Sequence, residues 1–198
     1  EGVFFMSYLT RDEIENFGFN KIGRNVLISD KTSIYNPQKI SIGDNVRIDD
    51  FCILSAGDGG IEIGNYVHIA SYSSLIGKEK IKLGDYSGLS SRVSIYSSSD
   101  DYSGLWMTNP TVPSTFTNVV SKPVILEKHV IVGCGAVILP GVLIQEGAAI
   151  AALSLVKKSC EPFYIYHGNP AKKIFARKKV IKNLERNLEE FDNLKCQK

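Results

Sequence analysis

Apolar residues recur at every sixth position over most of this chain of 198 residues. A period of six matches neither the turn of an α-helix nor the simple alternation of a strand. Three such units make a coil of about 18 residues, which suits a triangle with one inward apolar side chain on each side. The residues that begin the units before a long break are Ile22, Ile28, Ile34, Ile42, Ile48, Leu54, Ile63, Ile69, Leu75, Leu83, Leu89 and Ile95. The sequence therefore predicts an all-β solenoid whose stacked coils share one core.

One long insertion, residues 97–123, interrupts the repeat, which then returns from Val124 and continues without a further break. Loops longer than about 12–15 residues without structure of their own are usually functional or disordered. Trp106 and Phe116 favour order in this one. We expect the insertion to build an acceptor site and to pack against a neighbouring subunit.

Short helices are predicted at both ends of the repeat. Thr10 with Glu13 forms a capping-box pair, and Gly18 follows as a stop signal. The C-terminal helix is predicted from apolar residues on one face, namely Val180, Leu184, Leu188 and Phe191. We expect both helices to cover the open ends of the solenoid. The expected parts are a helical cap at residues 1–20, the β-helix at 21–160 with its inserted loop at 97–123, and a C-terminal segment with a helix at 161–198.

Composition excludes several classes of partner. The formal net charge is +2, so no strong single-sign field indicates nucleic acid. No apolar run approaches the roughly 18 residues of a membrane span. The four cysteines show no CxxC spacing, so no metal site or redox motif is predicted. We expect a cytoplasmic protein with reduced thiols and small-molecule partners.

The repeat frame, the long loop, the segment IVGCGAVILPGVLI and the terminal GNPAK resemble the hexapeptide-repeat acyltransferases over residues 22–177. The similarity is greatest to sugar acetyltransferases of the galactoside, maltose and chloramphenicol type and of surface-polysaccharide synthesis. It implies a left-handed parallel β-helix, acetyl-CoA as cosubstrate, and a homotrimer with active sites between subunits.

The resemblance also implies a path for coenzyme A beside the later coils. Cys134 and Ala152 match positions next to the pantetheine arm, where glycines such as Gly133 allow close backbone approach. Leu153 departs from the family pattern, which has glycine there. Basic residues at the nucleotide end of the cofactor match Lys157, Lys158 and Lys172.

The relatives carry a catalytic histidine in the long loop, and here Asp100 stands at or next to that position. We read His129 as an outward surface residue, and His167 as a possible contact to the cofactor's nucleotide. His68 remains as the candidate general base, because histidine titrates near neutrality. The frame points His68 outward beside Gly88, which should leave an open notch, with Asn65 and Tyr72 as polar neighbours that bind substrate.

The missing loop histidine favours an amine as acceptor, since an amine needs less activation than a hydroxyl. Asp100 and Asp101 would then hold or position an ammonium group, and Trp106 would bind substrate. The prediction is an acetyl-CoA-dependent N-acetyltransferase acting on a nucleotide-linked amino-deoxy sugar, of the GDP-perosamine type, in O-antigen synthesis. A sugar O-acetyltransferase and a non-catalytic β-helix binding protein are the alternatives. Whether His68 or Asp100 is the base stays open at this point.

Overall fold

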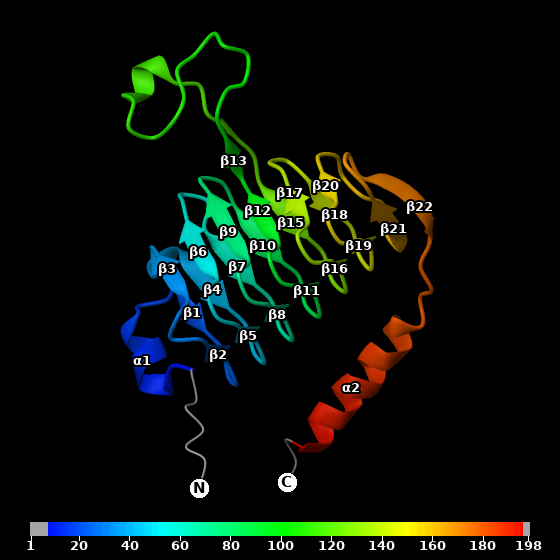
Figure 1. Cartoon of the computed structure of the whole chain (residues 1–198). Coiled ribbons are helices and arrows are strands. Elements are labelled where there is room, and N and C mark those ends of the chain that lie inside the picture. Colours follow the sequence, from blue (N-terminus) through cyan, green and yellow to red (C-terminus); the bar gives the residue numbers. More distant parts are fainter. Residues whose placement is uncertain (1–7, 196–198) are drawn as a thin grey trace, which may run out of the picture.

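A computed structural model of the chain describes residues 8–195 and shows a column of stacked triangular coils (Figure 1). The coils form three parallel sheets. The first contains β1 (Lys21–Ile22), β4 (Ile40–Ile42), β7 (Ile61–Ile63), β10 (Ile81–Leu83), β15 (Val124–Leu126) and β18 (Leu143–Ile144). The second contains β2 (Leu27–Ile28), β5 (Arg47–Ile48), β8 (His68–Ile69), β11 (Gly88–Leu89), β16 (Ile131–Val132), β19 (Ala149–Ile150), β21 (Tyr164–His167) and the antiparallel β22 (Lys172–Ala176). The third contains β3 (Ser33–Tyr35), β6 (Ile53–Ala56), β9 (Ser74–Gly77), β12 (Ser94–Tyr96), β17 (Val137–Ile138) and β20 (Leu155–Val156).

Three corners join these sheets. The first corner leads from the first sheet to the second, the second corner from the second sheet to the third, and the third corner back to the first sheet of the next coil. The predicted left-handed parallel β-helix, with a short N-terminal and a C-terminal helix, is confirmed.

The core is the column of inward apolar residues that the six-residue period predicts. Ile48, Ile69 and Leu89 stack in register on the second sheet and are fully buried. Burying such a side chain stabilises the fold by about 1.5–3 kcal/mol. Ile22 and Ile34 are only partly buried, because the first coil has a neighbouring coil on one side alone.

The N-terminal end is capped as predicted. Helix α1 (Arg11–Asn16) starts at Thr10, whose side chain and backbone exchange hydrogen bonds with Glu13 in a capping box. Gly18 follows the helix with φ +73°, a conformation that glycine adopts without strain. Ile14 is buried against the first coil, so α1 covers that end of the core.

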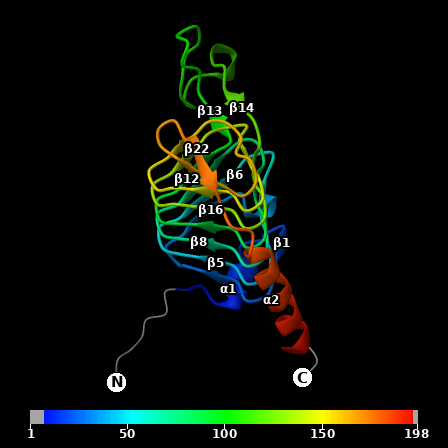
Figure 2. The ribbon, with the colours of Figure 1, turned by 90° about the vertical axis from the view of Figure 1, so that its right-hand side faces the viewer.

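The C-terminal end differs from the prediction. The hairpin of β21 and β22 extends the second sheet there, while α2 (Ile181–Lys195) runs back along the first corner (Figures 1 and 2). Its contacts to the coils include polar ones, such as Lys182 Nζ to Glu146 Oε2 at 2.9 Å and the Tyr66 hydroxyl to Asp192. Of the predicted apolar face, Val180, Leu184 and Phe191 are exposed. The expectation that α2 closes the solenoid was therefore wrong.

Residues 97–123 leave the third corner and project from the body (Figures 1 and 2). The base of this loop is a short antiparallel pair, β13 (Ser98–Ser99) with β14 (Val120–Ser121). Its tip contains a 3-10 turn at Ser114–Phe116, and a second such turn, Pro37–Lys39, lies at the third corner of the first coil. Within residues 8–195, no helix has the length and apolarity of a membrane span.

Candidate active site

His68 points outward from β8 on the second sheet, between Arg47 of the preceding coil and Gly88 of the following one. A side-chain carbon placed on Gly88 would meet no atom within 4 Å, so the predicted notch beside His68 is present. The notch belongs to a shallow cavity of about 320 Å³ whose lining residues are His68, Ala70, Gly88, Leu89, Ser90, Ser91 and Ile131. The cavity thus extends from His68 to the second corner.

Asp49 holds the imidazole of His68. His68 Nε2 lies 2.8 Å from Asp49 Oδ2, and Arg47 Nε donates to Asp49 Oδ1 at 2.7 Å. Burial alone would raise the pKa of Asp49, but the hydrogen bonds from His68 and Arg47 outweigh burial and keep this pKa below its usual value. A carboxylate that remains ionised can orient an imidazole and stabilise its protonated form.

Asp49 was missed in the sequence. The six-residue frame places Arg47 next to His68 in the adjacent coil, and Asp49 is the next outward residue after Arg47. From this spacing the sequence could have predicted that Asp49 lies close to His68.

Asn65 and Tyr72 lie at opposite edges of the second sheet, and neither lines the cavity at Gly88. Asn65 sits at the first corner, where its amide bridges two coils. It accepts from the Asp44 N–H at 2.8 Å and donates to Asp85 at 3.2 Å. Tyr72 sits at the second corner, where its ring stacks on Phe51 at 5.0 Å. Asn65 is therefore engaged in holding the coils together, whereas Tyr72 is engaged with a neighbouring ring.

The two other histidines have separate surroundings. His129 is buried under α2, and its Nε2 lies 2.8 Å from Glu185 Oε2. Its reading as an outward surface residue was wrong, because α2 covers the first corner. His167 is exposed at the end of β21, directly opposite Lys172 of β22.

Asp100, Asp101 and Trp106 belong to the loop that leaves the third corner, and this loop projects from the body of the solenoid (Figure 1). Asp101 Oδ1 accepts from the Ser103 N–H at 2.8 Å, and hydrogen bonding with Ser103 lowers the pKa of Asp101. Asp101 thus shapes a turn, while Asp100 is exposed. Within one chain the structure does not bring these residues to His68.

The residues expected beside coenzyme A divide into two groups. Cys134 and Ala152 lie on the second corner, in successive coils above Ser90. Gly133 permits this close stacking, since a side-chain carbon on it would come within 2.5 Å of the Ala152 nitrogen. Leu153 follows on the same corner and is exposed. The second corner therefore carries a continuous row of positions from the cavity to the C-terminal coils.

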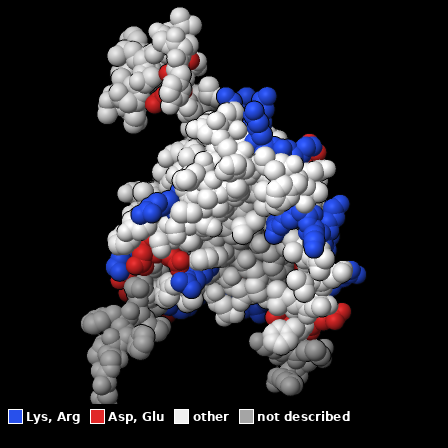
Figure 3. All heavy atoms as spheres, turned by 45° about the vertical axis from the view of Figure 1, so that its right-hand side comes forward, with Lys and Arg blue, Asp and Glu red and all other residues white. Residues whose placement is uncertain are grey.

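The lysines are exposed near the last coil. Lys172 begins β22, whereas Lys157 and Lys158 follow β20 toward the third corner. Figure 3 shows Lys and Arg side chains gathered on the part of the surface formed by the C-terminal coils. This end of the molecule is suited to phosphate groups.

The two buried cysteines, Cys52 and Cys160, are not suited to nucleophilic chemistry. Burial raises the pKa of Cys52 to about 11 and that of Cys160 to about 12. Neither thiol ionises near neutrality, so neither is an activated nucleophile. No group of three or more potential metal ligands occurs among the residues that the structure describes.

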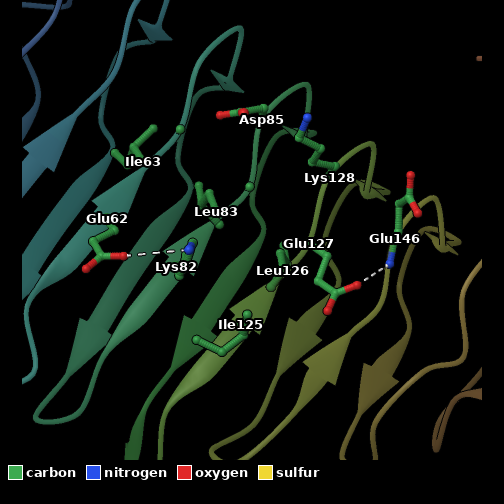
Figure 4. Close-up of a pocket in the computed structure, with 12 residues that line it drawn as sticks. Glu62, Ile63, Lys82, Leu83, Asp85, Ile125, Leu126, Glu127, Lys128 and Glu146 are labelled. Carbon is green, nitrogen blue, oxygen red and sulfur yellow. Dashed lines mark hydrogen bonds and ion pairs between the residues drawn. The ribbon is translucent and has the colours of Figure 1, made fainter. Parts of the chain in front are cut away.

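A larger hollow of about 680 Å³ lies on the first sheet (Figure 4). Both carboxylates and lysines line it, and several of them already have hydrogen-bond or ion-pair partners within the chain. Glu127 Oε2 accepts from the Glu146 N–H at 2.8 Å, and Lys82 lies 4.0 Å from Glu62. No histidine lines this hollow. The cavity at His68 offers a base and an open notch, so we assign the candidate site there.

No family model matches the sequence. The chain is 56% identical over 180 residues to a dTDP-4-amino-4,6-dideoxy-D-glucose acyltransferase from Escherichia coli, covering 91% of this chain and 94% of the relative. It is 28% identical to the putative lipopolysaccharide biosynthesis O-acetyl transferase WbbJ of E. coli K12, over 70% of this chain and 72% of that protein.

Solved structures of AntD, an N-acyltransferase from Bacillus cereus, superpose closely. The complex with dTDP and 3-hydroxybutyryl-CoA has a TM-score of 0.91 at 48% identity, covering 94% of this chain and 98% of AntD. Variants of AntD at one serine and at one aspartate have also been solved with coenzyme A and either dTDP or dTDP-4-amino-4,6-dideoxyglucose.

Proposed function

Because the chain belongs to the hexapeptide-repeat acyltransferase family, we propose that it transfers an acyl group from acyl-CoA to the amino group of dTDP-4-amino-4,6-dideoxyglucose. The E. coli relative that is 56% identical is named for this sugar, and AntD binds it together with coenzyme A. Both relatives use dTDP, so they favour a dTDP-linked acceptor over the GDP-linked sugar inferred from sequence. Acetyl-CoA is the donor that we propose.

The observation that carries this proposal is the row of second-corner positions that leads into the cavity at His68. The pantetheine arm would lie beside Cys134 and Ala152, with Lys172 toward its phosphates. Lys157 and Lys158 lie across the third sheet from these positions, near the third corner. We propose that they contact the nucleotide of coenzyme A from that side. The thioester would then reach Ser90 and the notch at Gly88.

The reaction follows from this arrangement. The neutral amine of the sugar attacks the thioester carbon, the C–N bond forms, and a tetrahedral intermediate develops. The C–S bond then breaks, and the coenzyme A thiolate leaves. One proton leaves the nitrogen, for which His68 is the proposed acceptor, oriented by Asp49. A proton returned to the thiolate completes the balance.

A serine and an aspartate of AntD that have been replaced for structural work stand ten positions apart in that protein. In this chain Ser90 and Asp100 have the same spacing, as do Ser91 and Asp101. Both serines line the cavity, whereas both aspartates lie in the loop that leaves the third corner. A second copy that placed its loop against the second sheet would bring Asp100 to Ser90 and His68. We therefore propose a homotrimer, the closed assembly of this family, with each site between two subunits.

The loop supports such an assembly. Between residues 97 and 121 its charged residues are Asp100 and Asp101 alone. Leu105 is 83% exposed and Tyr102 is 93% exposed. Large exposed apolar side chains on a projection with few charges are typical of a subunit contact. With Trp106 in the same loop, the second copy would supply both acceptor contacts and packing.

A release assay for coenzyme A thiol tests the proposed reaction. The purified protein is given acetyl-CoA with dTDP-4-amino-4,6-dideoxyglucose, with the 4-hydroxy analogue, or with GDP-perosamine. We expect turnover with the dTDP amino sugar far above the other two. Turnover with the hydroxy analogue would support the O-acetyltransferase alternative, for which WbbJ is the relevant relative. No turnover and no binding of coenzyme A would support a binding protein instead.

We propose the same biological setting as inferred from sequence, modification of a nucleotide sugar in the cytoplasm for a surface polysaccharide. The distant similarity to WbbJ supports this setting. Deletion of the encoding gene should remove the N-acylated 4-amino sugar from the polysaccharide without affecting its other sugars. Unchanged polysaccharide composition would refute the assignment.

A further inference from the structure

A ladder of stacked aromatic and cationic side chains runs along the second corner, below the coenzyme A positions. The rings of Phe51 and Tyr72 stack with centroids 5.0 Å apart. The Lys31 ammonium lies 5.8 Å from the centre of the Phe51 ring, and the Arg92 guanidinium lies 5.3 Å from that of Tyr72. We call these four residues the second-corner ladder.

A comparable stack of rings on the first corner packs against another part of the same chain. Tyr66, Tyr86 and His129 stack there with centroids 5.2 and 5.0 Å apart. Helix α2 covers this stack, with Asp192 bonded to the Tyr66 hydroxyl and Glu185 to His129. The first-corner rings therefore have partners within the chain.

Among residues 8–195, no helix covers the second-corner ladder. Phe51 is 47% exposed and Tyr72 is 53% exposed. Phe51, Tyr72 and Arg92 have positive φ, at 61°, 64° and 62°, as Tyr66 and Tyr86 of the covered first-corner stack do at 56° and 58°. This backbone conformation therefore recurs at the corners, and the exposure of the rings is what distinguishes the second-corner ladder.

Arg92 has an unusual charge environment. Arg11, Arg24 and Arg47 pair with carboxylates, Arg177 donates to two carbonyls, and Arg186 donates to Asn183. Among residues 8–195, Arg92 is the one arginine whose guanidinium has no hydrogen bond or ion pair, and the Tyr72 ring is its contact. An arginine held over a ring keeps its donor fork free for an anion.

Arg92 also borders the candidate active site. It directly follows Ser90 and Ser91, which line the cavity at His68. Its N–H donates to the Ser71 carbonyl at 3.0 Å, which fixes the corner next to Ala70 of the same cavity. An anion bound by Arg92 would therefore lie within reach of a sugar placed at His68.

We propose that Arg92, supported by Tyr72 and Phe51, binds the diphosphate of the nucleotide sugar. This inference rests on the proposed function and adds the residue that anchors the acceptor. The planar guanidinium suits a diphosphate because it presents parallel N–H donors to two oxygens. Stacking on Tyr72 lowers the ordering cost of the long side chain, so the site is organised before substrate arrives. Coenzyme A also contains a diphosphate, and the experiment must separate the two.

The test compares wild-type protein with Arg92→Gln and Arg92→Lys. We expect Arg92→Gln to raise the KM for the nucleotide sugar about 10–100-fold, the loss of a charge-assisted hydrogen bond pair. The KM for acetyl-CoA should stay within about twofold, and Arg92→Lys should recover part of the loss because the charge remains. Arg24→Gln is the matched control, since Arg24 lies on the first corner and pairs with Asp44.

Direct binding gives a readout that does not depend on turnover. Titration calorimetry with dTDP alone and with coenzyme A alone should show weaker dTDP binding in Arg92→Gln and unchanged coenzyme A binding. Weaker coenzyme A binding, unchanged dTDP binding, or loss of the native oligomer would each overturn the inference. Failure of wild-type protein to bind dTDP would instead refute the proposed function.

Discussion

Two glycines with opposite surroundings show how single residues shape this solenoid. Gly88 leaves open space on the outer face of the second sheet, whereas Gly133 lies against the backbone of the next coil. The first glycine therefore serves the cavity, and the second serves coil stacking.

Substitution of these glycines should separate activity from stability. Gly88→Ala adds to the notch beside His68 a carbon that meets no atom within 4 Å, and Gly88→Val fills the notch further, so kcat/KM should fall in both while the melting temperature of Gly88→Ala stays unchanged. Gly133→Ala should lower the melting temperature, because its new carbon would approach the Ala152 nitrogen at 2.5 Å. Thermal unfolding and steady-state kinetics on these variants check this. Full activity in Gly88→Val would exclude the notch from the site.

His68 and Asp49 act together in the proposed site. His68→Ala should lower kcat by about 10²–10⁴-fold, the usual contribution of a general base. Coenzyme A binding should persist, and added imidazole should restore part of the rate because the notch has room. Asp49→Asn should give a smaller loss of kcat with little change in either KM. Wild-type turnover by His68→Ala would move the role of base to Asp100.

At the scale of elements, the six-residue period determines most of what could be predicted. It placed the inward core, the outward row that contains His68 and Gly88, and the position of the long loop. These features follow from local spacing. The path of α2 does not, because it depends on ion pairs between Glu185 and the first corner, far away in sequence. The burial of His129 was missed for the same reason, whereas the contact between Asp49 and His68 could have been found from the six-residue spacing.

Docking of α2 should depend on pH. The hydrogen bonds from Lys128 and His129 lower the pKa of Glu185. A lowered folded-state pKa contributes stability above the unfolded value of about 4.3, and this contribution disappears as pH falls through the folded-state pKa. At neutral pH Glu185→Gln should therefore melt at a lower temperature than wild type, by about 2–6 °C.

The difference between Glu185→Gln and wild type should vanish in acid. Melting curves from pH 7 to pH 3 measure it. Glu190→Gln is the control, because it removes the same charge from the same helix at an exposed position. If Glu190→Gln lowered the melting temperature as much as Glu185→Gln, then net charge rather than the contacts of Glu185 would account for the stability of the docked helix.

At the scale of the whole molecule, the candidate residues cannot meet within one chain. His68 lies on the second sheet, and Asp100 lies in the loop that leaves the third corner. The sequence predicted both residues but could not place them relative to each other, since their meeting depends on a second copy. The loop also has large exposed apolar side chains, among them Leu105 and Tyr102. The proposed sharing of sites between subunits would account for both observations.

Mixed oligomers of His68→Ala and Asp100→Ala subunits test this sharing most directly. Each variant alone should have little activity. When the two are co-expressed or unfolded and refolded together, random assembly into trimers should leave about a quarter of the sites with both residues intact. We therefore predict that the mixture regains about a quarter of wild-type kcat with a wild-type KM. A mixture as inactive as its separate components would show that the two residues do not act in one site between subunits.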